Sequence, residues 1–169
     1  MDKERWDKYT NELTGSYEAE VSHRPGANNH IEIALNFFKS LNISSPEKKF
    51  LDIGCGNRES EIHTSCAWTG IDVYPVEPGI IKGDGHILPF EDKTFDIVYS
   101  SHTLEHVLSP IICIHEMIRV LKDNGDLIIC VPILPGFITM EHNYMMPKEG
   151  WMHLFARLKL ELVNYHEIS

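Results

Sequence analysis

Phe50-Leu51-Asp52-Ile53-Gly54-Cys55-Gly56-Asn57 is the stretch of this 169-residue chain that says most about its fold. An apolar strand leads directly into a turn with two glycines. Glycine lets a backbone approach a ligand closely, and the N–H groups that open a following helix can bind that ligand. Two glycines at this spacing are a weak signal when they stand alone, so the sequence on either side must support it.

Short strand-like runs alternate with helical periodicity on both sides of this turn. This alternation is typical of an α/β fold, in which a doubly wound parallel sheet carries helices on both faces. The predicted strands are 50–53, 67–73, 80–82, 95–99, 127–131 and 160–168. Hydrophobic residues at helical spacing predict helices over 29–41, from Pro110 (behind a Ser109 cap) to Asn124-Gly125, and from Pro147 onward.

The composition is that of an ordinary globular protein with a surplus of acid. The 25 Asp and Glu residues outnumber the 15 Lys and Arg residues, which gives a formal net charge of −10. Tight binding to a phosphate backbone needs clustered basic residues, so we predict no nucleic-acid partner. No apolar run is long enough to span a bilayer, and the N-terminus lacks the layout of a signal peptide. We therefore expect no membrane partner and a cytoplasmic location.

Two acids near the glycine turn indicate which ligand it binds. Asp72 ends the next strand, where a carboxylate can accept hydrogen bonds from ribose hydroxyls. Glu59 stands where a dinucleotide fingerprint has its third glycine, and a carboxylate beside a pyrophosphate is unfavourable. Asp52, directly before the turn, suits an ammonium group. The pattern favours S-adenosylmethionine, which has an ammonium group and no phosphate, over a nicotinamide cofactor, which remains a minor alternative.

Several blocks in register resemble the class I methyltransferases that use S-adenosylmethionine, in the type 11 branch that acts on small molecules. These blocks are 52–56, Asp72, 83–90, 95–106 and 119–125, and the resemblance is strong over 50–131. It implies a mostly parallel, Rossmann-like methyltransferase sheet. It also implies methyl transfer to a small-molecule acceptor, with S-adenosylhomocysteine as the product.

The resemblance also implies which residues surround the cofactor. The glycine turn would hold the methionine tail, and the acid after it would hold both ribose hydroxyls. Asp84 is similar to the acid that accepts from the adenine amine, and the backbone near Ser100 would meet the amino group of the tail. The implied cofactor residues are Asp52, Gly54, Cys55, Gly56, Asp72, Val73, Asp84, Gly85, His86 and Ser100.

The chain departs from the family pattern in three places. Arg58 stands where a small residue is usual, and 57–66 leaves room for a helix of only about two turns. The predicted strands also lack the seventh, antiparallel strand of the family, so 160–168 would have an open edge. A truncated natural form, a fragment, and a partner chain that covers the edge, including a second copy in a homo-oligomer, all remain open.

His102-Thr103-Leu104-Glu105-His106 matches H-x-x-E-H, a zinc peptidase signature, but it follows a strand directly and Pro110 interrupts it. Some methyltransferases bind a divalent metal through Glu and His residues in this turn and a later His, a position that His142 resembles. Because His102 replaces an acid of that pattern, we favour local hydrogen bonding and predict no metal. The four cysteines form no C-x-x-C pair and are expected to be buried, reduced thiols.

Methyl transfer needs alignment and exclusion of water, and a general base only where the nucleophile must lose a proton. His102 and His142 are the candidate bases, since imidazole titrates near neutral pH. We predict a single domain over 1–169, with a lid or cap over 1–28, a cofactor-binding core over 29–131, and an acceptor loop, helix and last strand over 132–169. The alternative is a non-catalytic module that binds cofactor or a partner on a shortened methyltransferase fold.

Overall fold

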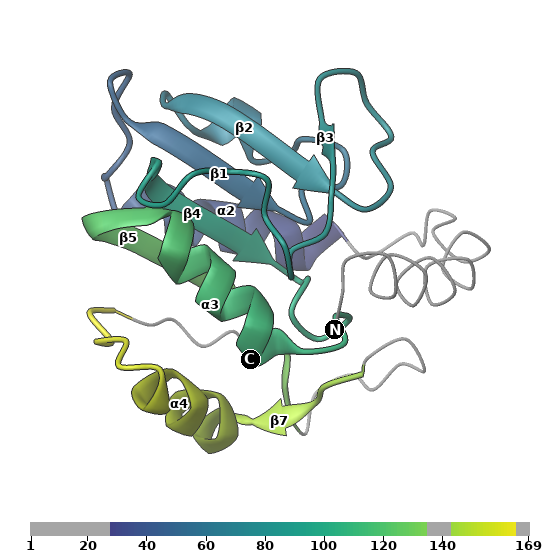
Figure 1. The fold of residues 1–169 in the computed structure, drawn as a ribbon, viewed down its shortest axis with the longest axis vertical. Coiled ribbons are helices and arrows are strands. Elements are labelled where there is room, and N and C mark those ends of the chain that lie inside the picture. Colours follow the sequence, from purple (N-terminus) through teal and green to yellow (C-terminus); the bar gives the residue numbers. More distant parts are fainter. Residues whose placement is uncertain (1–27, 135–142, 165–169) are drawn as a thin grey trace. The chain divides into compact units, whose positions relative to one another are not determined.

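The computed structural model describes residues 28–134 and 143–164, and the fold described here is that of the unit Ile31–Ser169. Its main sheet has five strands, all paired in parallel, in the order β3-β2-β1-β4-β5 (Figure 1). This order reverses between β1 and β4, as in a doubly wound sheet. The strands are β1 (Lys49–Ile53), β2 (Ala67–Asp72), β3 (Ile81–Lys82), β4 (Phe95–Ser101) and β5 (Leu121–Cys130).

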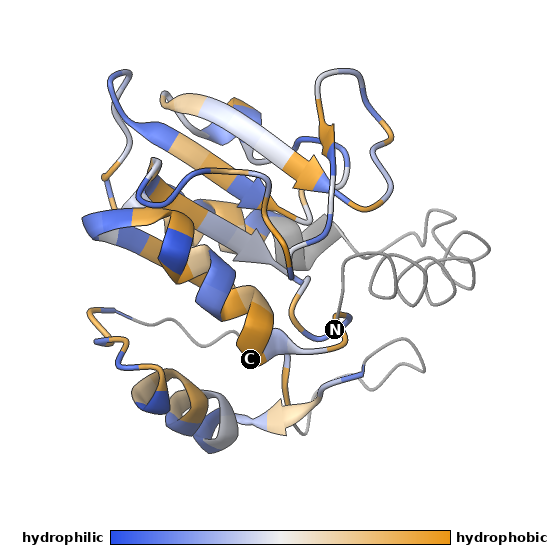
Figure 2. Ribbon diagram, in the orientation of Figure 1, coloured by the Kyte–Doolittle hydropathy of each residue, from blue (hydrophilic) through white to orange (hydrophobic). Residues whose placement is uncertain are grey.

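Three α-helices and a small second sheet complete the described fold. The helices are α2 (Asn28–Ser40), α3 (Pro110–Val120) and α4 (Lys148–Arg157), and a 3-10 turn, η1, spans Glu61–His63. β6 (Ile133–Leu134) and β7 (Met146–Pro147) pair in parallel. α3 and α4 carry hydrophobic and hydrophilic residues along their length, as helices with one buried face do (Figure 2).

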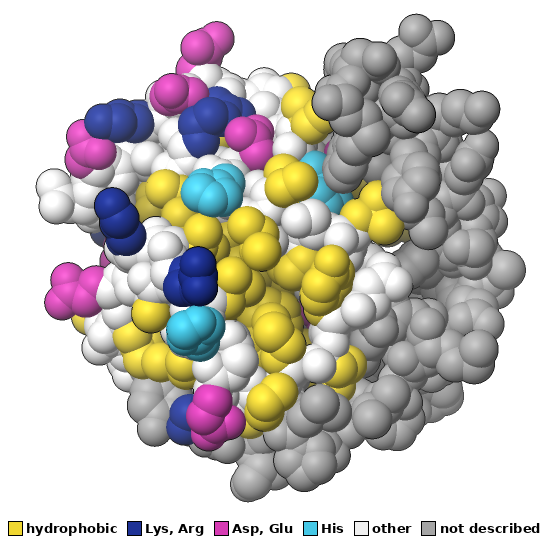
Figure 3. Space-filling model, turned by 60° about the horizontal axis from the view of Figure 1, so that its bottom comes forward, with side chains coloured by type: hydrophobic (Ala, Val, Ile, Leu, Met, Phe, Trp, Pro, Cys, Tyr) yellow, Lys and Arg dark blue, Asp and Glu magenta, His cyan; other side chains and the backbone are white. Residues whose placement is uncertain are grey.

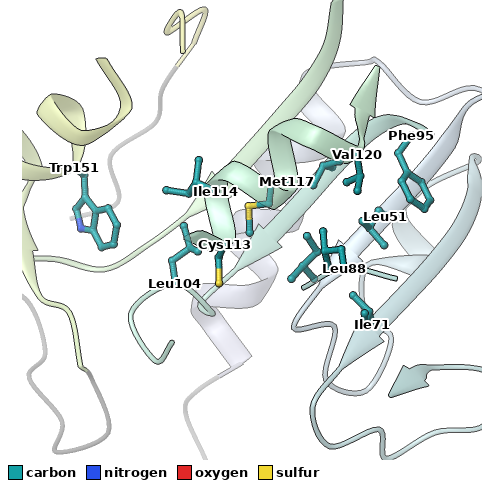
Figure 4. Packing of buried hydrophobic residues seen from close by; sticks show 12 residues of the cluster. Leu51, Ile71, Leu88, Phe95, Leu104, Cys113, Ile114, Met117, Val120 and Trp151 are labelled. Atoms are coloured by element: carbon teal, nitrogen blue, oxygen red, sulfur yellow. The ribbon is translucent and has the colours of Figure 1, made fainter. Parts of the chain in front are cut away.

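Hydrophobic cores lie on both faces of the sheet because successive strand residues point to opposite sides. Leu51 joins one core with α3, and Phe50 joins the other with Phe38 of α2. The ring centroids of Phe38 and Phe50 lie 5.3 Å apart in an edge-to-face arrangement. Cys113, Ile114, Met117 and Val120 of α3 line the first core together with Leu51 and Ile71 of the strands (Figure 4). Helices on both faces were predicted, and the prediction is confirmed.

α3 begins where the sequence predicts and ends earlier. The Ser109 hydroxyl accepts from the Ile112 N–H at 3.5 Å, and Pro110 follows at the first helical position. The prediction that this helix reaches Asn124-Gly125 is wrong, because the helix ends at Val120 and β5 begins at Leu121. Pairing of β5 with β4 shifts register between Phe95 and Ile97, and the Asn124-Gly125 turn lies inside that irregularity.

The predicted strand over 160–168 is wrong for 160–164, which form no strand, and 165–168 lie outside the described residues. Lys159 adopts a left-handed φ of 59°, and the Leu160 N–H donates to the Phe155 carbonyl at 3.1 Å. This cap ends α4, and Leu162 and Val163 are then exposed rather than alternately buried. In the described part of the chain the main sheet therefore ends at β5.

In Figure 3, charged side chains of both signs lie at the left and the top of a central group of hydrophobic side chains. Across the described residues, the helices are too short or too polar to cross a bilayer.

Candidate functional site

The glycine turn is held by the end of β2 through backbone hydrogen bonds. The Gly54 and Cys55 N–H groups donate to the Ile71 carbonyl at 2.9 and 3.3 Å. Oδ2 of Asp72 accepts from the Gly56 N–H at 2.9 Å, and Oδ1 accepts from the Tyr74 N–H at 2.8 Å. A carboxylate has about four acceptor positions, so Asp72 retains capacity for ligand hydroxyls after these two bonds.

The two glycines of the turn are required for different reasons. Both have positive φ, 71° at Gly54 and 51° at Gly56, where a side chain is disfavoured. A Cβ at Gly54 would also overlap the side chain of Thr103, with its Cγ2 only 2.7 Å away, whereas nothing lies within 4 Å of a Cβ at Gly56. Gly54 is therefore packed against the turn after β4, and Gly56 lies beside open space.

Asp52 is a buried carboxylate at the end of β1. The Ser60 hydroxyl donates to its Oδ2, and the Trp68 indole N–H donates to the same hydroxyl at 2.9 Å. Burial raises the pKa of Asp52 to about 7; the hydrogen bond from Ser60 opposes this shift, and the charge of Asp72 adds to it. Asp52 can therefore change its protonation state near neutral pH, and it lies close enough to Asp72 for the two charges to interact.

The segment after the glycine turn departs from the expected helix. Only the three-residue turn η1 forms there, and Arg58 adopts a left-handed φ of 67°. The Arg58 guanidinium pairs with Glu61 at 2.7 Å, donates to the Pro78 carbonyl and lies 5.0 Å above the Trp68 ring. Arg58 thus links Glu61, Pro78 and Trp68. This segment does not form the helix that was expected after the glycine turn.

Asp84 lies in a hydrogen-bond chain that sequence reasoning missed. Its Oδ1 accepts from the His86 backbone N–H at 2.9 Å and lies 2.6 Å from Nδ1 of the same residue. Nε2 of His86 accepts from the Ser109 N–H at 3.1 Å, which assigns the ring proton to Nδ1. The resemblance implies only that His86 lies beside the cofactor, although a histidine two residues after an aspartate in a turn is a signal for such a side-chain contact.

The other predicted cofactor residues lie at or near the same edge of the sheet. Register pairs Ile53 with Ser100, so the end of β1 lies beside the end of β4. Ser100 is buried, and its hydroxyl is without a hydrogen-bond partner. Gly85 lies in the same loop as Asp84, and Val73 directly follows β2 and is partly exposed.

The turn after β4 carries the histidine cluster. Glu105 is fully buried, with its Oε1 3.3 Å from Nδ1 of His102 and 3.8 Å from Nε2 of His106. His142, the second candidate base, lies outside the described residues. Within the described parts of the chain no group of three or more His, Cys, Asp or Glu residues is arranged to hold a metal ion.

The four thiols form no disulfide. Cys55 and Cys113 are buried and Cys66 and Cys130 are partly buried, so the expectation of buried, reduced thiols is confirmed in full only for the first pair. Burial raises the pKa values of the Cys55 and Cys113 thiols, with nearby carboxylates adding to the shift, so both remain protonated.

Comparison with known proteins supports a methyltransferase fold. Residues 51–129 match the model of a methyltransferase domain family. This match covers somewhat less than half of the chain. A demethylmenaquinone methyltransferase of Staphylococcus aureus is 34% identical over 139 residues, which cover 67% of this chain and 56% of the relative. One from a Mycobacterium species is 26% identical over 166 residues, which cover 86% of this chain and 72% of the relative.

Solved structures support the fold of the methyltransferase domain. The cyclase SpnF superimposes with a TM-score of 0.72 at 18% identity, over 89% of this chain and 64% of its own. A phosphoethanolamine N-methyltransferase of Haemonchus contortus, solved with S-adenosylhomocysteine, gives a TM-score of 0.61 at 17% identity, over 75% and 36% of the two chains. S-adenosylmethionine is the cofactor of this family.

The residues of the domain fit that cofactor in three respects. Asp72 has acceptor capacity for hydroxyl groups at the end of β2. Open space adjoins Gly56, where a side chain would intrude. The Ser100 hydroxyl is buried without a partner beside the end of β1, and such a group is usually satisfied by a ligand or by water.

Proposed function

We propose that this chain transfers a methyl group from S-adenosylmethionine to a small-molecule acceptor by in-line displacement. The observation that carries the proposal is the Asp72 carboxylate, which receives the Gly56 N–H at 2.9 Å and so joins the glycine turn to the end of β2. In a doubly wound sheet, ligands bind outside the carboxyl ends of the strands, where the strand order reverses. Asp52, Asp72 and Ser100 come from the strands on either side of that point.

The cofactor supplies an activated methyl group, and the chain supplies position. We propose that Asp72 accepts from the ribose hydroxyls and that Val73 packs beside them. The Asp52 carboxylate and the backbone near Ser100 face the ammonium group, while Gly54, Cys55 and Gly56 surround the methionine tail. Asp84, braced by His86 next to Gly85, accepts from the adenine amine. Holding both reactants in line can lower the activation barrier of methyl transfer by roughly several kcal/mol.

The acceptor that we propose is a hydroxylated aromatic ring of the quinol type. The two curated relatives described above are named for the methylation of demethylmenaquinone, which supports this class. The proposed division keeps a cofactor-binding core over 29–131 and an acceptor region over 132–169. Acceptor binding is assigned to the last region because it follows the carboxyl end of β5. The lid or cap predicted over 1–28 lies, except for its last residue, outside the described residues.

Calorimetric titration with S-adenosylmethionine, followed by a methyl-transfer assay with 1,4-naphthoquinol, tests the proposal. We expect saturable binding and a methylated naphthoquinol product together with S-adenosylhomocysteine. Absence of cofactor binding would contradict the proposal. Binding without turnover on this acceptor or on a panel of phenols and sugars would instead support the non-catalytic module.

A further inference from the structure

Glu105 is a buried carboxylate with unsatisfied oxygens. Both of its oxygens are inaccessible, and neither makes a hydrogen bond. Burying a charge without hydrogen bonds is costly, so folds retain such groups where a function requires them. The groups near its oxygens are imidazoles, with Nδ1 of His102 at 3.3 Å and Nε2 of His106 at 3.8 Å.

Backbone hydrogen bonds hold the main chain at Glu105 and His102, although neither carboxylate oxygen of Glu105 accepts a hydrogen bond. The Tyr144 N–H donates to the Glu105 carbonyl at 3.0 Å, and the Asn143 side chain donates to the His106 carbonyl at 2.6 Å. The His102 N–H donates to the Cys130 carbonyl at 3.0 Å. His102 nevertheless adopts a left-handed φ of 52°, and strain of this kind in a non-glycine residue is often found at functional sites.

The same turn lies against the proposed cofactor site. Thr103, between His102 and Glu105, donates its hydroxyl to the Ile53 carbonyl at 3.2 Å and fills the space beside Gly54. The His102 side chain is 34% exposed while that of Glu105 is 1% exposed, so the imidazole reaches the surface and the carboxylate lies behind it. A buried acid behind a partly exposed histidine is the arrangement in which a carboxylate orients a general base.

We propose that Glu105 is a positioning residue that holds the His102 imidazole as the general base for an acceptor whose nucleophile must lose a proton. This inference rests on the proposed function and narrows its acceptor to a hydroxyl, a phenol or an enol-type carbon. The 3.3 Å contact lacks hydrogen-bond geometry here, and catalytic hydrogen bonds often shorten only when the reactants are bound.

In the proposed step, loss of a proton from the acceptor accompanies transfer of the methyl group. The acceptor gives its proton to Nε2 of His102, and its electron pair forms the bond to the methyl carbon. The bond between that carbon and the sulfonium breaks with its electrons on sulfur, which leaves the neutral thioether S-adenosylhomocysteine. Glu105 stabilises the imidazolium, which then releases its proton to water.

Among the described residues, three other titratable side chains belong to segments that adjoin this pair. His106 lies on the same turn, and Tyr144 lies on the segment before β7, with its hydroxyl bound to the Leu108 carbonyl at 2.7 Å. Cys130 lies on β5, where burial, with a contribution from the charge of Glu105, raises its pKa to about 11. Cys130 therefore stays a thiol at neutral pH, so His106 is the neighbour whose titration must be separated from that of His102.

The deciding experiment is an NMR titration of the histidine side chains in the unliganded full chain, wild type against Glu105→Gln. A carboxylate at this distance stabilises the protonated form of an imidazole, so we expect Glu105→Gln to move the midpoint of the measured His102 titration to lower pH. His102→Asn assigns the resonance, and asparagine tolerates the left-handed φ. Glu161→Gln, an exposed carboxylate, is the matched control and should change nothing. An unchanged His102 pKa in Glu105→Gln overturns the proposal.

Turnover gives a second, independent readout with 1,4-naphthoquinol as the acceptor. We expect Glu105→Gln and His102→Asn each to lower kcat roughly 100-fold, with the double variant little worse than either, because residues of one unit are not additive. The cofactor Kd should stay within about twofold, and His115→Asn should behave as wild type. Wild-type kcat in Glu105→Gln, or turnover that chelators abolish and a divalent metal restores, contradicts the proposal.

Failure of this inference is distinguishable from failure of the proposed function. If the wild type does not bind S-adenosylmethionine, the proposed function is wrong. If it binds and Glu105→Gln changes neither the His102 pKa nor turnover, only the base assignment is wrong. Should Glu105→Gln fail to fold, Glu105→Asp keeps the charge on a shorter side chain; an unchanged pH–rate profile in that variant overturns the inference.

Discussion

The two acidic turns at the carboxyl edge of the sheet are built in opposite ways. Asp72, the last residue of β2, accepts from two backbone N–H groups, and Asp52 accepts from the Ser60 hydroxyl. Glu105, after β4, is more deeply buried than Asp72 and accepts no hydrogen bond. The first turn is therefore organised by the protein's own backbone before any ligand binds. The second holds a buried carboxyl group without hydrogen bonds. The two predictions of largest effect test what the first turn contributes to cofactor binding and how its contact with the second contributes to stability.

The largest effect is expected for Asp72→Ala. This change removes the acceptor for the ribose hydroxyls as well as the bond from the Gly56 N–H. Hydrogen bonds to a charged group contribute about 1.5–3 kcal/mol each, so S-adenosylmethionine affinity should fall by about 100-fold or more. Calorimetric titration measures this affinity, and Asp123→Ala, which removes an exposed carboxylate, is the control. Unchanged affinity would remove the cofactor role from this turn.

The second largest effect is a loss of folding stability, which should differ between the two glycines of the turn. Gly54→Ala should destabilise the fold by about 2–3 kcal/mol, because it adds an overlap with Thr103 to the strain of a positive φ. Gly56→Ala, with open space around it, should cost only about 1 kcal/mol. Urea unfolding measures both. Equal losses would mean that contact with the turn after β4 does not matter, and Thr103→Ala should partly rescue Gly54→Ala.

A smaller effect concerns the pH dependence of Asp52. Its pKa of about 7 in the folded chain exceeds the ordinary value of 3.8, so the folded state binds a proton that the unfolded state has lost. Stability from this group is present in full below about pH 4 and is lost as the pH rises toward 7. Asp52→Asn should remove about 1–2 kcal/mol of the decline between pH 5 and pH 7. If the free energy of unfolding falls equally with pH in wild type and in Asp52→Asn, the pKa of Asp52 is not raised.

The smallest effect is expected at Arg58. Its pair with Glu61 is partly exposed, and exposed pairs contribute little. Arg58→Ala should lower the melting temperature by about 2 °C, and Arg58→Gly should be at least as stable as Arg58→Ala, because glycine relieves the φ of 67°. A large loss in either variant would mean that the network around Trp68 supports the turn more than exposure suggests.

The sequence by itself determined most of the sheet. Apolar runs predict β1, β2 and β4, and Asp72 was predicted at the end of the strand that follows the glycine turn, where it is found. Its predicted contact with ribose hydroxyls stays a prediction. These features are local: strand propensity, glycine conformation and the position of an acid at a strand end follow from a few adjacent residues. The Ser109 cap of α3 was predictable for the same reason.

Tertiary structure alone decided the features that depend on residues far apart in the chain. Gly54 must be glycine partly because Thr103 lies against it, α3 stops at Val120 because β5 pairs with β4, and His86 joins Asp84 to the start of α3. The burial of Glu105 depends in the same way on distant packing. Periodicity and spacing report what each segment prefers, whereas burial and hydrogen-bond satisfaction depend on what the rest of the chain places beside it.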